Sequence, residues 1–102
     1  VQSLRVKDVR TEKETVLSVS GIFIFVGTIP HSAFLGGFVE IDQGGWIVTG
    51  RHLSTRRPGV YAAGDVRDTD LRQVVTAAAD GARAAMNAYH FLSTTGVLGR
   101  AE

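Results

Sequence analysis

The chain has 102 residues, 44% of them hydrophobic and 21% charged, and a formal net charge of +1. This is the composition of one small globular domain, and the balanced charge argues against a nucleic acid or an anionic membrane as partner. No cysteine is present, which excludes disulfides, thiolate metal sites and thiol nucleophiles within the chain. His31, His52 and His90 are not spaced as ligands on one helical turn, so we expect ordinary surface or half-buried histidines and no metal site.

The first part of the chain predicts a hairpin followed by a buried strand. Apolar residues alternate with polar ones across 1–10, a charged turn follows at 11–14, and 15–19 would return as the second strand. Residues 22–26, Ile-Phe-Ile-Phe-Val, have no polar face, which predicts a strand covered by protein on both sides. This apolar run is far shorter than the roughly 20 residues that cross a bilayer. A lone hairpin cannot cover such a strand, so we expect the chain to be part of a longer protein.

The middle of the chain predicts several short elements. Pro30 ends the apolar strand because its ring fixes φ, and paired glycines mark the later turns. Trp46 is expected to pack one of these elements onto the core. The predicted elements are a helical turn at 31–35, a second hairpin made of 38–41 and 46–49, and a short strand at 60–63.

Residues 71–92 predict one long helix, because this stretch is rich in alanine, the best helix former. Asp70 followed by Gln73 predicts a capping box with Asp70 as the N-cap. The small polar residues 93–102 predict a flexible tail. One helix face, which suits packing against a sheet or a ligand, is predicted from residues at three- and four-residue steps: Val74, Ala78, Ala82, Ala85, Tyr89 and Leu92.

The junction between the short strand and the helix carries the strongest functional signal. Asp65 would lie at the carboxyl end of a strand, where ligands of open α/β sheets bind and where a carboxylate suits sugar-like hydroxyls. The free N–H groups at the helix start favour an anion, or a ring that gains negative charge on reduction. The simpler interpretations are that Asp65 caps a turn and that Arg72 is a solvated side chain.

Three segments in order also resemble a known family. Thr55-x4-Val-Tyr-Ala-Ala-Gly-Asp65 resembles the second flavin-binding fingerprint of the two-dinucleotide-domain flavoproteins. Arg72-Gln73-Val74 is similar to the helix start of low-molecular-weight thioredoxin reductases. Residues 21–30 resemble the strand by which that family crosses from its pyridine-nucleotide domain to its flavin domain. Order and spacing match over 1–92.

The resemblance implies a partial α/β, Rossmann-like fold for FAD and NAD(P), with β-hairpins and one long C-terminal helix. Residues 1–27 would end the pyridine-nucleotide-binding domain, 28–92 would form the C-terminal part of the FAD-binding domain, and 93–102 the tail. The whole protein would use FAD and NADPH to reduce a thioredoxin-like disulfide. It would be a cytoplasmic homo-oligomer, with dimer as the expected state, and would need neither membrane nor nucleic acid.

The resemblance also assigns roles to particular residues. A carboxylate would bond the ribityl chain of FAD, a glycine would allow close approach near the pyrophosphate, and the helix start would face the flavin. The residues implied for FAD are Gly64, Asp65, Arg72, Gln73 and Val74. For the passing nicotinamide nucleotide they are Val26 and Gly27.

Some family features are absent from this chain: the glycine-rich FAD loop, the NADP-binding glycine motif and the redox-active cysteine pair. His31 stands where the family usually has Asn. We therefore predict that the chain alone does not reduce disulfides. Two alternatives stay open: a ferredoxin–NADP reductase of the same architecture, and a non-enzymatic, self-associating module that pairs through 22–26.

Overall fold

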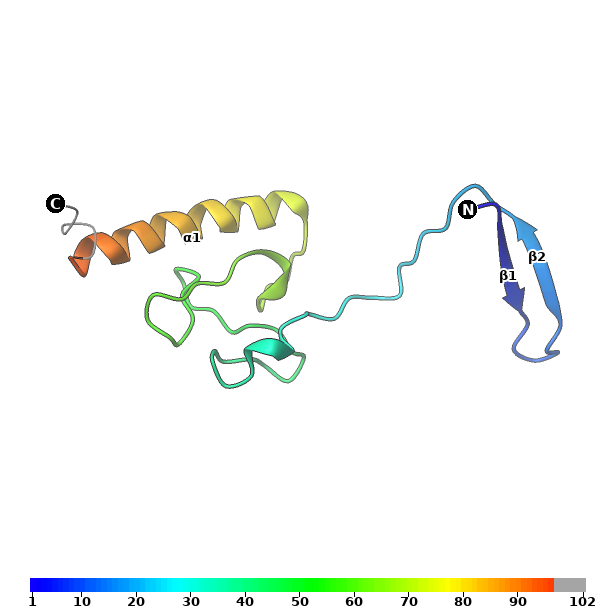
Figure 1. The fold of residues 1–102 in the computed structure, drawn as a ribbon, viewed down its shortest axis with the longest axis horizontal. Coiled ribbons are helices and arrows are strands. Elements are labelled where there is room, and N and C mark those ends of the chain that lie inside the picture. Colours follow the sequence, from blue (N-terminus) through cyan, green and yellow to red (C-terminus); the bar gives the residue numbers. More distant parts are fainter. Residues whose placement is uncertain (97–102) are drawn as a thin grey trace.

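The computed structural model describes residues 1–96, and most of the predicted tail lies outside this part of the chain (Figure 1). A two-stranded sheet and one long helix are joined by an extended segment and a set of loops. In chain order the elements are β1 (Ser3–Lys7), β2 (Glu14–Ser18), the 3-10 turns η1 (Ala33–Leu35) and η2 (Gly64–Val66), and the helix α1 (Val74–Thr94). The helical turn predicted at 31–35 is therefore present as η1.

The first predicted hairpin is confirmed. β1 and β2 pair antiparallel, with Ser3 opposite Ser18 and Lys7 opposite Glu14. Asp8 closes the turn, because its Oδ1 accepts the N–H groups of Arg10 and Thr11 at 2.9 and 2.8 Å. These backbone hydrogen bonds hold the pKa of the Asp8 carboxyl below its usual value of 3.8. The hairpin thus satisfies its own turn without help from other elements.

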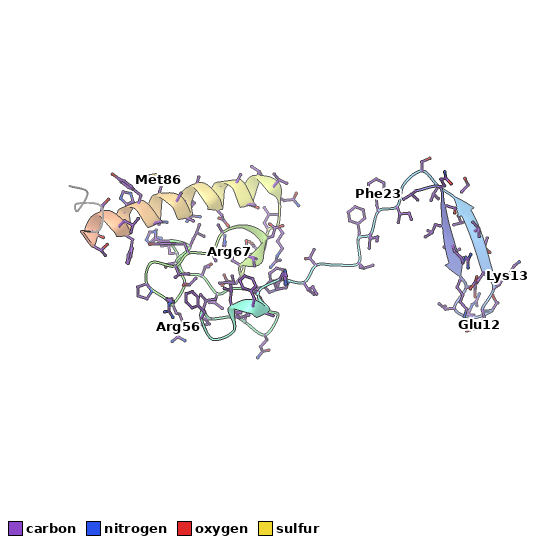
Figure 2. All side chains as sticks on the ribbon, in the orientation of Figure 1. Glu12, Lys13, Phe23, Arg56, Arg67 and Met86 are labelled. Carbon is purple, nitrogen blue, oxygen red and sulfur yellow. The ribbon has the colours of Figure 1, made fainter. Side chains whose placement is uncertain are left out.

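The strand predicted at 22–26 does not form. The segment is extended but unpaired, and its side chains are 43% to 91% exposed. Figure 2 shows Phe23 on this segment, between the hairpin and the loops. A strand needs a neighbour for its N–H and C=O groups, and none is supplied by residues 1–96. The Cα radius of gyration is accordingly 21.0 Å, against about 13 Å for a compact chain of this length.

The second predicted hairpin and the strand predicted at 60–63 are each present only as a single β-bridge. Ile41 pairs with Ile47, and Ser54 pairs with Tyr61. Asp42 limits the pairing of the second hairpin. Its Oδ1 accepts the N–H groups of Gly44 and Trp46 at 2.8 Å each, which curls the chain between the two predicted strands. The buried hydrophobic residues of the described chain come from these loops and are Ile47, Leu53 and Ala62.

The helix α1 begins three residues later than predicted and ends at Thr94 rather than 92. Its N-cap is Gln73, whose N–H is accepted by Oγ1 of Thr76 at 3.1 Å. The capping role predicted for Asp70 is therefore wrong, because Thr76 supplies the side chain of the box. Among the described residues, no helix is both long and apolar enough for a membrane span.

The predicted packing face of α1 is also wrong. Val74 is 88% exposed, and Ala78, Ala82 and Tyr89 are exposed as well. Met86, labelled in Figure 2, is 56% exposed. The helix instead docks on the loops through another stripe that includes polar side chains, which an apolar pattern does not identify. The residues of this stripe that meet the loops are Ala77, Asp80, Asn87 and Phe91.

Candidate functional site

A cavity of about 430 Å³ lies where η2 and the approach to α1 meet the end of the extended segment. Four separate stretches of chain contribute to its wall, and the predicted site residues Asp65 and Arg72 both line it. The lining residues are Thr28, Ile29, Pro30, His31, Trp46, Asp65, Val66 and Arg72.

Arg72 makes the most distinctive contact in this wall. Its guanidinium carbon lies 3.7 Å from the centroid of the Trp46 ring, the geometry of a cation–π pair. Its Nε is buried and has no hydrogen-bond partner among residues 1–96. The sequence predicts that Trp46 packs a hairpin onto the core, whereas the structure shows it as a flat support for Arg72.

Gly64 places Asp65 at the cavity by bringing the η2 loop close to α1. Its φ is +75°, a conformation that residues with a Cβ rarely adopt. A Cβ on Gly64 would lie 3.3 Å from the Cβ of Ala77 in α1. Gly64 is therefore required for the approach of loop and helix, and Asp65 follows it with an exposed side chain.

A buried ion pair fixes the same loop from the helix side. Asp80 is only 6% exposed, and its Oδ2 lies 2.6 Å from Nε of Arg67 and 3.2 Å from the N–H of Gly64. The hydrogen bond from Arg67 is the main reason that the pKa of Asp80 is lowered, against the opposing effect of burial. Figure 2 shows Arg67 between the loops and α1.

Sequence reasoning missed this pair. The available signal was a carboxylate inside an alanine-rich stretch of helix, a residue type that is almost never fully buried without a partner. Asp80 accepts hydrogen bonds from the backbone N–H of Gly64, which precedes Asp65, and from the side chain of Arg67, which follows it. The pair therefore holds both flanks of the predicted ligand-binding carboxylate.

A short parallel pairing joins the Trp46 segment to the η2 loop. The N–H of Ile47 donates to the carbonyl of Val66, and the N–H of Asp68 donates to the carbonyl of Ile47, both at 3.0 Å. The hydroxyl of Thr49 adds a bond to Oδ1 of Asp68 at 2.8 Å. These bonds set Trp46 beside the residues that precede α1.

The other predicted site residues lie around the cavity rather than in its wall. Gln73 and Val74 are the cap and first residue of α1, directly after Arg72. Val26 and Gly27 belong to the extended segment, which enters the wall only at Thr28. The structure therefore brings Asp65 and Arg72 together, and leaves Val26 and Gly27 outside the lining.

Asp65 and Arg72 thus line one cavity between a bridge-paired segment and the start of a long helix, and ligands of α/β proteins bind at the carboxyl ends of strands. The family described as pyridine nucleotide-disulphide oxidoreductase matches residues 1–81, and the chain belongs to this family. Both the α/β class and the resemblance to thioredoxin reductases are thus confirmed.

Thioredoxin reductases from distant organisms are among the individual relatives. The chain is 44% identical to the thioredoxin reductase of Chlamydia pneumoniae, over 90% of this chain and 30% of that protein. It is 46% identical to thioredoxin reductase 1, mitochondrial, of Arabidopsis thaliana, over 91% and 25%. It is 44% identical to the thioredoxin reductase of Aquifex aeolicus, over 91% and 29%.

Solved structures show the same similarity in three dimensions. The thioredoxin reductase of Streptococcus pyogenes superposes with a TM-score of 0.74 at 39% identity, over 91% of this chain and 30% of that one. The Lactococcus lactis thioredoxin reductase gives 0.67 at 44% identity, over 91% and 31%. The chain spans less than a third of the length of each of these relatives.

Proposed function

We propose that this chain supplies the C-terminal part of the FAD-binding domain in an NADPH-dependent thioredoxin-disulfide reductase. Residues 1–27 would end the pyridine-nucleotide-binding domain, and 28–92 would belong to the FAD-binding domain. The similarity to thioredoxin reductases over 90% of the chain supports the enzyme class. The cytoplasmic location, the homo-oligomeric state and the thioredoxin-like partner remain predictions of the resemblance.

One observation carries the proposal: Asp65 and Arg72, chosen from the sequence alone, line one cavity. Its volume of about 430 Å³ lies within the range of about 300–1,000 Å³ that small-ligand pockets span. The exposed carboxylate of Asp65 offers acceptors for hydroxyl groups, and the guanidinium of Arg72, which lines the same cavity, offers N–H donors for a ligand oxygen. The donors and acceptors present therefore fit the group.

Each residue then has a defined task. Asp65 would accept hydrogen bonds from the sugar-alcohol chain, and Gly64 would allow close approach near the pyrophosphate. Gln73 and Val74 stand at the positive end of the helix dipole, where they would stabilise negative charge on the ring; the N–H of Gln73 is donated to Thr76, so Val74 would supply the free N–H. Val26 and Gly27 would lie along the path of the nicotinamide nucleotide.

When bound, FAD supplies the two-electron chemistry that links NADPH to a disulfide. The chain itself has no cysteine, so the thiols that exchange with a substrate disulfide must come from elsewhere in the whole protein. We therefore expect the purified chain to show no NADPH-dependent disulfide reduction above a free-flavin blank. Turnover above that blank would contradict the claim that the reacting thiols come from elsewhere in the whole protein.

The binding site is tested by titrating the chain with FAD and following the anisotropy of flavin fluorescence. We expect weak, saturable binding, because the family's glycine-rich FAD loop is not in this chain. Asp65→Asn should weaken it about tenfold, the cost of one charged hydrogen bond. Asp70→Asn is the matched control, since Asp70 is also exposed but lies outside the cavity lining. Equal affinities in the two variants would remove Asp65 from the site.

A second candidate follows from the exposed apolar residues of 22–26: in isolation the chain associates with a second copy of itself. Unpaired backbone and uncharged side chains invite pairing between identical segments. Phe25→Lys should then abolish a concentration-dependent mass increase in light scattering. Val9→Lys controls for added charge, because Val9 is similarly exposed but lies in the hairpin turn. A monomer at all concentrations rejects self-association.

A further inference from the structure

The stack of Arg72 on Trp46 has no function so far beyond shaping a wall of the cavity. We infer that Trp46 is a positioning residue, which holds the Arg72 guanidinium in the cavity wall so that it meets an acceptor oxygen of the flavin nucleotide. The inference rests on the proposed function and adds to it a residue outside the flavin fingerprint and the helix start.

The first step is the state of Arg72. Its guanidinium carbon lies 3.7 Å from the Trp46 ring centroid, so one flat face of the cation is covered by the indole. Its Nε is buried without a partner among residues 1–96, although Arg72 lines a cavity. A buried N–H without an acceptor is rare, because it has lost water and gained nothing in exchange. An oxygen bound against the part of Arg72 that lines the cavity would give this cation an acceptor.

The second step is that Trp46 is held independently of Arg72. The backbone N–H of Trp46 donates to Oδ1 of Asp42 at 2.8 Å, and the neighbouring residue Ile47 pairs with the η2 loop. Gly44 leaves room for the indole, since a Cβ there would lie 2.9 Å from Cδ1 of Trp46. The backbone of Trp46 is thus fixed without Arg72, and its indole provides the face against which the Arg72 guanidinium lies.

The chain contains its own control for this interaction. Arg57 lies over the ring of Phe38 at 4.1 Å, a second arginine–aromatic stack. Neither Arg57 nor Phe38 lines the cavity that holds Asp65 and Arg72. Loss of the Phe38 stack should therefore change packing in the same manner without changing a ligand contact.

The experiment combines FAD titration with NMR of the arginine Nε–H groups, using Trp46→Leu, Trp46→Phe and the control Phe38→Leu. Flavin anisotropy reports affinity without relying on tryptophan emission. Trp46→Leu should weaken FAD binding about five- to tenfold, as expected for loss of a partly desolvated cation–π contact. Trp46→Phe should restore affinity to within about twofold, since a ring remains. The Phe38→Leu variant should bind FAD with the same affinity as the unsubstituted chain.

The Arg72 Nε–H signal provides the readout that a purely structural role would not move. In the parent chain it should carry the ring-current shift of the indole, shift again as FAD saturates, and exchange more slowly with water. Gly44→Ala keeps the tryptophan but displaces it, so it should reduce both the ring-current shift and the affinity. This variant tests the inference even where Trp46→Leu fails to fold, as judged by the circular dichroism of α1.

The outcomes separate the inference from the proposed function. If FAD changes the anisotropy but leaves the Arg72 signal unmoved, the positioning role is overturned and the FAD site stands. Equal losses in Trp46→Leu and Phe38→Leu would also overturn it, because the effect would then be general packing. If FAD produces no anisotropy change in the parent chain, the proposed function fails, and the inference fails with it.

Discussion

Residues 1–27 and residues 28–96 differ in the contacts that hold their chain in place. The first region contains the most apolar stretch of the chain, 22–26, yet this stretch has no partner and lies in solvent. The second region has nearly the same share of hydrophobic residues, yet its loops are fixed to α1 by Asp80 and Asn87, which bond to loop backbone at Gly64 and His52. The difference teaches that order here depends on satisfied backbone groups rather than on hydrophobic character alone.

The largest expected effect is on the second region, through Asp80→Asn. This change leaves the half-buried Arg67 cation without its countercharge, and removing one partner of a buried pair costs about 3 kcal/mol or more. Thermal unfolding followed by circular dichroism of α1 measures the loss. Amide signals of β1 and β2 should stay unchanged in the same sample. Loss of the hairpin signals as well would show that the two regions are coupled.

Gly64→Ala should have the next largest effect. It adds the strain of a positive φ and a contact with Ala77 in α1, together about 2 kcal/mol. Gly37→Ala is the matched comparison, because Gly37 has nearly the same φ of +76° but nothing within 4 Å of the position a Cβ would take. It should cost about 1 kcal/mol. Equal destabilisation would mean that the loop–helix contact contributes nothing beyond the backbone conformation.

Acid should weaken the second region through Asp80. Its folded-state pKa lies below the ordinary 3.8, so the unfolded chain takes up the proton more readily. The stabilisation is complete above the ordinary pKa and is lost as pH falls below about 4, toward the folded-state pKa. A melting midpoint that stays level from neutral pH to about 5 and then drops is expected. Asp80→Asn should flatten that drop, and a steep drop in the variant would assign it to another carboxylate.

The smallest effect is expected in the first region. Phe25 is 89% exposed, so Phe25→Ser should change the free energy of unfolding of 28–96 by less than about 0.5 kcal/mol. Chemical denaturation monitored at α1 provides the measurement. A larger change would reveal that the extended segment supports the loops, which would contradict the separation of the two regions.

Local patterns predict the elements whose stabilising contacts are themselves local. The alternation of 1–19 predicts the hairpin because its turn is closed by its own Asp8. The alanine content predicts α1. Its N-cap is Gln73 rather than Asp70, because the side chain of Thr76 accepts the N–H of Gln73. The strand at 22–26 could not be predicted correctly, because pairing depends on neighbours that no local pattern reports.

The candidate site could be predicted in part for the same reason. Asp65 and Arg72 stand in short motifs, so their chemistry is visible in the sequence. The ion pair between Arg67 and Asp80 joins residues on separate elements, and the support from Trp46 comes from a distant loop. Neither contact has a sequence spacing that would indicate it.

The small number of buried hydrophobic residues has a calorimetric consequence. Among the described residues only Ile47, Leu53 and Ala62 belong to this group, so melting this chain hydrates little new apolar surface. The heat-capacity increment should fall well below the roughly 12–15 cal/mol/K per residue of ordinary domains. The stability curve would then be shallow against temperature, with cold and heat weakening the chain only gradually.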